Sequence, residues 1–217
     1  MTILYTNGCS YTANFDLERK NTYPAILADR LEWKLVDKSE PGSCNSRIIR
    51  TTIDDCVKLR SQTDEKIVAL IQLSHLFRTE YPTDNLSADP FCSVKPTAPN
   101  NSNSQTPEPA GKYADYYWRL HSNHHLLVNL ITDLIGLISY FKQNNVEYLI
   151  YLGPNENSIY ADVIGNDLRF KLVNSDPHVL DLTEFNMLDL TGEQTHPTAD
   201  GMRAIADYFF NLLCEPA

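Results

Sequence analysis

The chain has 217 residues, of which 42% are hydrophobic and 21% charged, a composition typical of a globular protein rather than a disordered or membrane protein. A formal net charge of −10 at pH 7 argues against a nucleic-acid partner, because affinity for phosphates comes chiefly from Lys and Arg. We therefore expect a single domain spanning residues 1–217, with neither nucleic acid nor a membrane as a partner.

Cysteine usage and the first residues bear on the compartment. The 5 cysteines are odd in number, scattered and without a CxxC pair, which argues against a disulfide framework and a thiolate zinc site. The first residues lack the basic and long apolar regions of a signal peptide. We expect reduced thiols and a cytoplasmic protein.

The first third of the chain alternates short apolar runs with amphipathic segments. Residues 2–6 predict a strand, and the apolar spacing of residues 22–32 predicts a helix. A second strand is expected at 34–37. Residues 43–61 open with cap-type residues and keep apolar side chains on one face, as a helix does. The nearly unbroken apolar run 66–74 is typical of a strand covered on both faces.

One segment interrupts this alternation. Residues 81–111 are rich in Pro, Ser, Asn and Thr and show little periodicity, so we expect a structureless loop insertion there. It follows the carboxyl end of a strand, where ligands bind in open α/β sheets. A lid or specificity loop and a plain surface loop are both open interpretations.

The alternation resumes beyond the loop. Residues 114–145 predict a long helix and residues 146–153 a strand, and a last strand near 178–182 precedes a terminal helix at 199–213. Strands that alternate with helices predict an α/β protein, a three-layer α/β/α sandwich with a mostly parallel sheet.

A serine lies just beyond the first predicted strand. If Cys9 packs against the sheet, strand alternation turns Ser10 toward the opening beyond the strand end, where its N–H can serve an oxyanion. Serine is a poor nucleophile without a base, and His196, on a loop ahead of the terminal helix, is the candidate. Cys9 as the nucleophile is the alternative, although a free cysteine is most often a small buried hydrophobe.

Three blocks carry a resemblance to a known family. "NGCSYT", "PGSCNSRIIRTT" and "EQTHPTADGMRAIADYF" together resemble the SGNH (GDSL-like) hydrolase superfamily, in particular its intracellular and phage-type members. The resemblance implies a flavodoxin-like strand order, Ser10 as nucleophile and His196 as base, with no cofactor. Where the family has an Asp three residues before the histidine, this chain has Glu193. Asp189 or a backbone carbonyl is the alternative group to orient the imidazole.

The resemblance also implies an oxyanion hole. Its donors are the N–H of Ser10, a glycine after the second strand and an asparagine after the third. Gly42 matches the glycine, but the asparagine is missing. Ser74 at the end of the third strand, or Asn45 from the preceding helix, is the candidate replacement. Losing one such donor costs roughly 10²–10³-fold in rate.

Several other polar residues have a functional and a plain interpretation. His75 and Arg78 follow the third strand, and either bind substrate or cap the mouth of the site. His121 and His125 have the helical spacing of paired zinc ligands, but no third ligand is evident and we expect no metal. The single glycine of the first block does not fit a phosphate-binding loop, so a nucleotide is not expected.

The sequence thus predicts a serine hydrolase that cleaves a small acyl ester. Its partner would be a small-molecule or glycan ester, including the O-acetyl group of a sugar, in keeping with the superfamily. The alternative is a binding or assembly protein that keeps the fold with little or no catalysis, because the oxyanion asparagine is missing and Glu replaces Asp. The sequence indicates no oligomeric state.

Overall fold

The structure is a computed structural model of the chain. It describes residues 1–14, 16–82, 91–94, 116, 121–153, 167–185, 187–191 and 196–214. The predicted orienting carboxylate, Glu193, lies outside the described residues, as does most of the predicted loop insertion.

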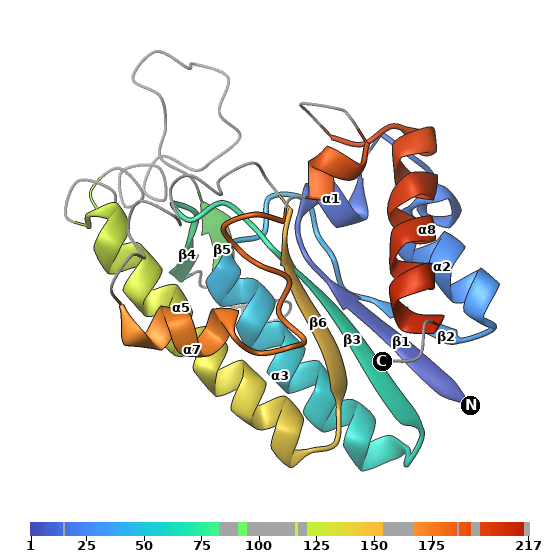
Figure 1. The fold of residues 1–217 in the computed structure, drawn as a ribbon, viewed down its shortest axis with the longest axis horizontal. Helices are drawn as coiled ribbons and strands as arrows, with labels where there is room; N and C mark the ends of the chain where they lie inside the picture. The colour runs from blue at the N-terminus through green and yellow to red at the C-terminus, as the bar shows by residue number, and fades with distance from the viewer. Residues whose placement is uncertain are drawn as a thin grey trace.

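A four-stranded parallel sheet forms the centre of the molecule (Figure 1). Its strands are β1 (Thr2–Asn7), β2 (Lys34–Asp37), β3 (Lys66–Leu73) and β6 (Glu147–Leu152). The strand order is β2-β1-β3-β6, which is the flavodoxin-like order implied by the resemblance. Because all four strands run parallel, their carboxyl ends meet at one edge of the sheet.

The last predicted strand, at 178–182, is reduced to one parallel bridge. Val179 pairs with Ile150, and the N–H of Leu180 donates to the Ile150 carbonyl over 2.9 Å. The bridge extends the sheet beyond β6 by one residue, so the prediction of a strand there is confirmed in position but not in length.

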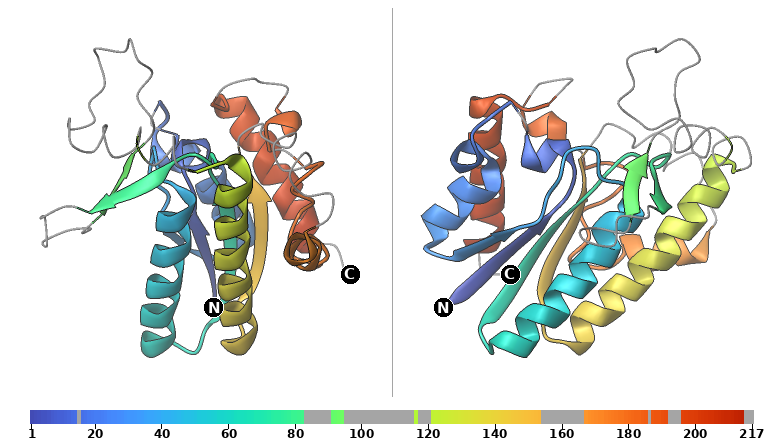
Figure 2. Two further views of the ribbon diagram at one scale, coloured as in Figure 1. Left: turned by 90° about the vertical axis from the view of Figure 1, so that its left-hand side faces the viewer. Right: turned by 180° about the vertical axis from the view of Figure 1, so that it is seen from behind.

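Helices cover both faces of the sheet, as the view from behind shows (Figure 2). On one face lie α2 (Tyr23–Leu31) and α8 (Ala199–Cys214), and on the other α3 (Asn45–Gln62), α5 (Asn123–Gln143) and α7 (Leu168–Asn174). The short elements are α1 (Ser10–Ala13), η1 (Arg19–Asn21) and η2 (Met187–Leu190). The three-layer α/β/α sandwich is confirmed.

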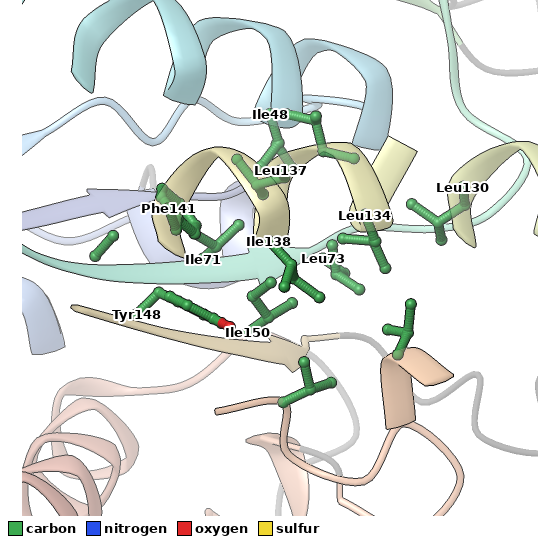
Figure 3. Packing of buried hydrophobic residues seen from close by; sticks show 14 of the residues in the cluster. Ile48, Ile71, Leu73, Leu130, Leu134, Leu137, Ile138, Phe141, Tyr148 and Ile150 are labelled. Atoms are coloured by element: carbon green, nitrogen blue, oxygen red, sulfur yellow. The ribbon is translucent and has the colours of Figure 1, made fainter. Parts of the chain in front are cut away.

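Strand alternation divides the core between the two faces. From Ile67 to Leu73 every residue of β3 is buried, as expected for a strand covered on both sides. Ile71 and Leu73 pack with α3 and α5, whereas Leu70 packs with α2 and α8. Figure 3 shows the first of these clusters, in which α5 lies over β3 and β6.

Helix α5 begins later than the helix predicted at 114–145. It starts at Asn123, and the Ser122 hydroxyl caps it by accepting the N–H of His125 over 3.3 Å. Within the described residues α5 alone is long and apolar enough to cross a membrane, by length and composition. Its buried residues belong to the core against α3 and the sheet, as in an ordinary core helix.

The predicted structureless insertion contains strand. β4 (Thr79–Pro82) and β5 (Phe91–Val94) form an antiparallel hairpin, so this part of the prediction at 81–111 is wrong. Main-chain pairing between two short segments is compatible with many side chains, which is why composition alone did not indicate it. Arg50 of α3 forms an ion pair with Glu80 over 2.6 Å and joins the hairpin to the body of the domain.

Candidate active site

Ser10 begins α1, immediately beyond the carboxyl end of β1. Cys9 is fully buried, as expected if it packs inward, and its Sγ accepts from the side-chain amide of Gln72 over 3.4 Å. Ser10 is buried as well, with 4% of its surface exposed, so the expectation from strand alternation that Ser10 is the exposed residue of the pair is wrong. Within the described residues no hydrogen bond uses the Ser10 N–H. That N–H is therefore available to a substrate oxygen.

Two side chains hold the loop between β1 and Ser10. Asn7 Oδ1 accepts the N–H of Gly8 and Gln72 Oε1 accepts the N–H of Cys9, both over 2.9 Å. A Cβ on Gly8 would lie 2.8 Å from Gln72 Oε1, so only glycine allows this close approach. Gln72 was missed by the sequence analysis, and the signal that could have indicated it is one polar residue inside an apolar run.

His196 meets Ser10 from the other end of the chain. Its Nε2 lies 2.7 Å from Ser10 Oγ, within hydrogen-bond distance, although 186 positions separate the two residues. The loop that carries His196 is hydrogen-bonded to the end of α1 through Asn14. The Asn14 side-chain amide donates to the Pro197 carbonyl over 2.6 Å. Figure 1 shows α1 and the start of α8 at the same end of the sheet.

The environment of His196 favours the neutral imidazole. Burial lowers its pKa below the ordinary value of 6.5, Asp16 raises it, and the guanidinium of Arg78 and the neighbouring His75 lower it further. A neutral imidazole with Nε2 unprotonated accepts the Ser10 hydroxyl proton. This is the state that a general base requires.

Two carboxylates, Glu193 and Asp189, are the candidates to orient the imidazole. Glu193, predicted for that role, lies outside the described residues. Asp189, the alternative, is described: it lies exposed on η2, and no hydrogen bond within the described residues joins its carboxylate to His196. The described geometry therefore gives no support to Asp189.

Gly42 lies in a tight turn after β2. The Ser43 N–H donates to the Glu40 carbonyl over 3.2 Å, and Gly42, which follows a proline, has a φ of +85°, as in a type II turn. The Glu40 N–H donates to the Gly8 carbonyl over 3.1 Å. The turn that carries Gly42 is thus joined to the loop that carries Ser10.

Ser74 and Asn45, the two candidates for the third oxyanion donor, bind each other. The Ser74 N–H donates to Asn45 Oδ1 over 2.7 Å, and Asn45 Nδ2 donates to the Ser74 carbonyl over 3.1 Å. Both residues are buried. This pair of hydrogen bonds fixes α3 against the end of β3. It occupies the Ser74 N–H and one N–H of the Asn45 amide.

Arg78 lies next to Ser74, and the rings of Tyr11 and His75 lie near the His196 ring. Arg78 Nη1 donates to Ser74 Oγ over 3.0 Å. The Tyr11 ring lies 5.0 Å from the His196 ring and 6.2 Å from the His75 ring, between centroids. Both residues proposed to bind substrate, His75 and Arg78, therefore lie at the site of Ser10 and His196.

The described residues form no metal site. No group of three or more His, Cys, Asp or Glu side chains within them is placed to hold a metal ion. His121 lies before α5 and stacks on His125, with 4.5 Å between ring centroids. Within the described residues Cys9, Cys56 and Cys214 form no disulfide.

Solved structures, but no family model or curated protein, resemble this chain. No family model matches the sequence, and no curated protein does. Among solved structures, the chain is similar to a psychrotrophic esterase from Pseudoalteromonas sp., at 16% identity over 98% of this chain and 96% of that chain, with a TM-score of 0.55. It is similar to a protein of the G-D-S-L family from Desulfitobacterium hafniense, at 9% identity over 97% of this chain and 98% of that chain, with a TM-score of 0.57.

An acetylxylan esterase from Geobacillus stearothermophilus is also similar, at 11% identity over 99% of this chain and 94% of that chain, with a TM-score of 0.52. At these identities the likeness concerns the fold alone: the chain has the α/β/α fold of these esterases.

Proposed function

We propose that this protein is a serine hydrolase of the SGNH type that cleaves small acyl esters. The observation that carries the proposal is the 2.7 Å contact between Ser10 Oγ and His196 Nε2. The lowered pKa of His196, caused first by its burial, keeps the base in its reactive form at neutral pH. The intracellular, phage-type branch of the superfamily and a cytoplasmic location belong to the same proposal.

In the first half of the reaction Ser10 Oγ attacks the acyl carbon. Its proton passes to His196 Nε2, and the carbonyl electron pair moves onto oxygen, where the N–H groups of Ser10 and Gly42 stabilise it. Collapse of this intermediate breaks the ester C–O bond. The imidazolium returns the proton to the leaving alkoxide, so an alcohol departs and an acyl-serine remains.

In the second half water replaces the alcohol. His196 takes a proton from the water that attacks the acyl-serine, and then returns a proton to Ser10 as the carboxylic acid leaves. Glu193 holds the imidazole in the tautomer that leaves Nε2 unprotonated. No cofactor takes part in these steps.

The substrate we propose is a small acyl ester, and an O-acetyl group on a sugar is the leading example. Support comes from the likeness to esterases, one of which acts on acetylxylan according to its name. Tyr11 and His75 offer flat rings beside the base, a surface on which a sugar or other planar alcohol can rest.

Labelling with a fluorophosphonate tests the proposal directly. Wild type is expected to gain one adduct by intact mass, whereas Ser10→Ala and His196→Ala gain none. Cys9→Ala is the matched control, because it removes the thiol that is the alternative nucleophile next to Ser10. This variant is expected to label as wild type does. Labelled protein then justifies a screen of acetyl esters.

The outcome that contradicts the proposal is equally direct. If folded wild type takes no adduct and cleaves no ester, the chain is better explained as a binding or assembly protein that has kept the fold. Adduct on wild type that disappears in Cys9→Ala would assign the nucleophile to Cys9 instead.

A further inference from the structure

The proposed oxyanion hole has two N–H donors, Ser10 and Gly42, where the resemblance implies three. Asn45 and Ser74, the expected sources of the third, bind each other. That pairing occupies the Ser74 N–H and one N–H of the Asn45 amide, so a further donor between the Gly42 turn and the end of β3 would strengthen the site.

Arg78 occupies that position. A turn closed by its own N–H on the His75 carbonyl, over 3.3 Å, brings Arg78 back over the end of β3. Its Nη1 donates to Ser74 Oγ over 3.0 Å and to the Ser43 carbonyl over 3.3 Å. Since Ser43 directly follows Gly42, the guanidinium bridges the two elements on which the oxyanion donors are expected.

No described Asp or Glu side chain forms an ion pair with Arg78. Most described arginines lie within ion-pair distance of an Asp or Glu side chain: Arg19, Arg30, Arg47, Arg50, Arg169 and Arg203. Within the described residues Arg78 has no such partner, and it donates to the Ser43 carbonyl and the Ser74 hydroxyl. A half-buried guanidinium that donates to neutral oxygens keeps its charge available for an anion.

That charge also acts at the reacting centre. The positive charge of Arg78 lowers the pKa of His196, so the guanidinium is close enough to the imidazole for the two to interact. A guanidinium carries five N–H donors in a planar fork, and the hydrogen bonds to Ser43 and Ser74 both use Nη1. Within the part of the chain that the structure describes, the donors on the other nitrogens are left for a substrate oxygen.

We propose that Arg78 is the third oxyanion donor of this enzyme, in place of the asparagine that the superfamily uses. This inference rests on the proposed function. As Ser10 Oγ bonds to the acyl carbon and the carbonyl pair moves to oxygen, Arg78 donates an N–H hydrogen bond to that oxygen and keeps its proton. A charged donor stabilises the developing anion more strongly than a neutral amide.

The test uses the intact protein and a neutral ester, p-nitrophenyl acetate, so that Arg78 has no anionic substrate group to bind. Arg78→Ala is expected to lower kcat roughly 10²–10³-fold with little change in KM, because the interaction is made chiefly in the transition state. Added guanidinium, well below denaturing concentration, is expected to restore part of kcat. Arg203→Ala, which removes an exposed arginine of α8, is the matched control for charge.

A second variant covers the case in which Arg78→Ala does not fold. Arg78→Lys keeps the charge but loses the fork, and it is expected to lower kcat by more than about threefold, although less than Arg78→Ala does. A kcat within about threefold of wild type in a folded Arg78 variant, or a loss confined to KM, overturns the inference.

Wild type serves to separate this inference from the proposed function. Wild type that neither takes the fluorophosphonate nor cleaves the ester overturns both. Active wild type with an unaffected Arg78 variant overturns the role of Arg78 alone.

Discussion

Asn14 and Pro197 join the two ends of the chain at the candidate active site. The Asn14 side-chain amide donates to the Pro197 carbonyl over 2.6 Å. Asn14 lies four residues after Ser10, and Pro197 directly follows His196. The Asn14 N–H in turn donates to the Ser10 carbonyl over 3.0 Å. One buried asparagine therefore fixes the nucleophile and the base relative to each other, and it is a positioning residue.

Replacing Asn14 by glycine is expected to lower kcat/KM by roughly tenfold or more, because a small displacement of a base costs activity steeply. Glycine tolerates the φ of 35° at this position, so only the amide is lost. Asn145→Gly is the matched control: Asn145 also has a positive φ, of 52°, and lies in the turn before β6. Steady-state kinetics with equal losses in both variants would contradict the positioning role.

The pH dependence of activity is expected to follow His196. Burial lowers the pKa of this group, so kcat/KM should rise with pH through a value below 6.5 and be level at neutral pH. Asp16 raises the pKa of His196, and Asp16→Asn should therefore move the acid limb to lower pH. Removing the positive charge of Arg78 should move it to higher pH.

The measurement is a kcat/KM profile from pH 4 to 8 for each variant. Asp29→Asn removes one exposed carboxylate of α2 and serves as the control for net charge. Shifts of the same sign in the Asp16 and Arg78 variants would show that the acid limb does not report on His196.

The core of the site could be predicted from sequence because each part belongs to a local pattern. Ser10 follows a strand and His196 precedes a terminal helix, and the parallel sheet places both at its carboxyl edge. The structure brings them to 2.7 Å. Gly42 likewise follows a strand and has the positive φ that a turn after proline requires.

The remaining contacts depend on side-chain direction across elements, which a linear pattern does not contain. Asn45 and Ser74 lie 29 positions apart and were considered separately as donors, but they bind each other. Gln72 reads as a residue of a buried strand, yet its amide holds the nucleophile loop. Both cases arise because buried polar groups find partners wherever the fold brings them.

The carboxylate behind His196 can be assigned by mutation. Glu193→Gln keeps the size of the side chain and removes its charge, and it is expected to lower kcat roughly 10- to 10⁴-fold, the upper figure being the loss known for a triad carboxylate turned to an amide. Asp189→Asn is the matched variant and is expected to be near wild type. If Asp189→Asn is the damaging change, the base is oriented from η2 instead.

Gly153 provides a test of how tightly Gln72 is held. A Cβ on Gly153 would lie 2.6 Å from Gln72 Cδ, so Gly153→Ala must displace the side chain that accepts the Cys9 N–H. Overpacking of this kind costs about 1–3 kcal/mol of unfolding free energy. In a chain of this size that corresponds to a fall in Tm of roughly 2–12 °C. Because the nucleophile loop loses its anchor, kcat should fall as well.

Gly136→Ala is the control for Gly153→Ala, because it makes the same substitution at an uncrowded glycine. Gly136 lies exposed inside α5, and a Cβ there would meet nothing within 4 Å. Alanine should therefore stabilise the helix by about 0.5–1 kcal/mol and leave kcat unchanged. Calorimetry and kinetics on both variants separate the two effects. A Gly153→Ala protein with the Tm and kcat of wild type would mean that Gln72 moves freely and does not hold the Ser10 loop.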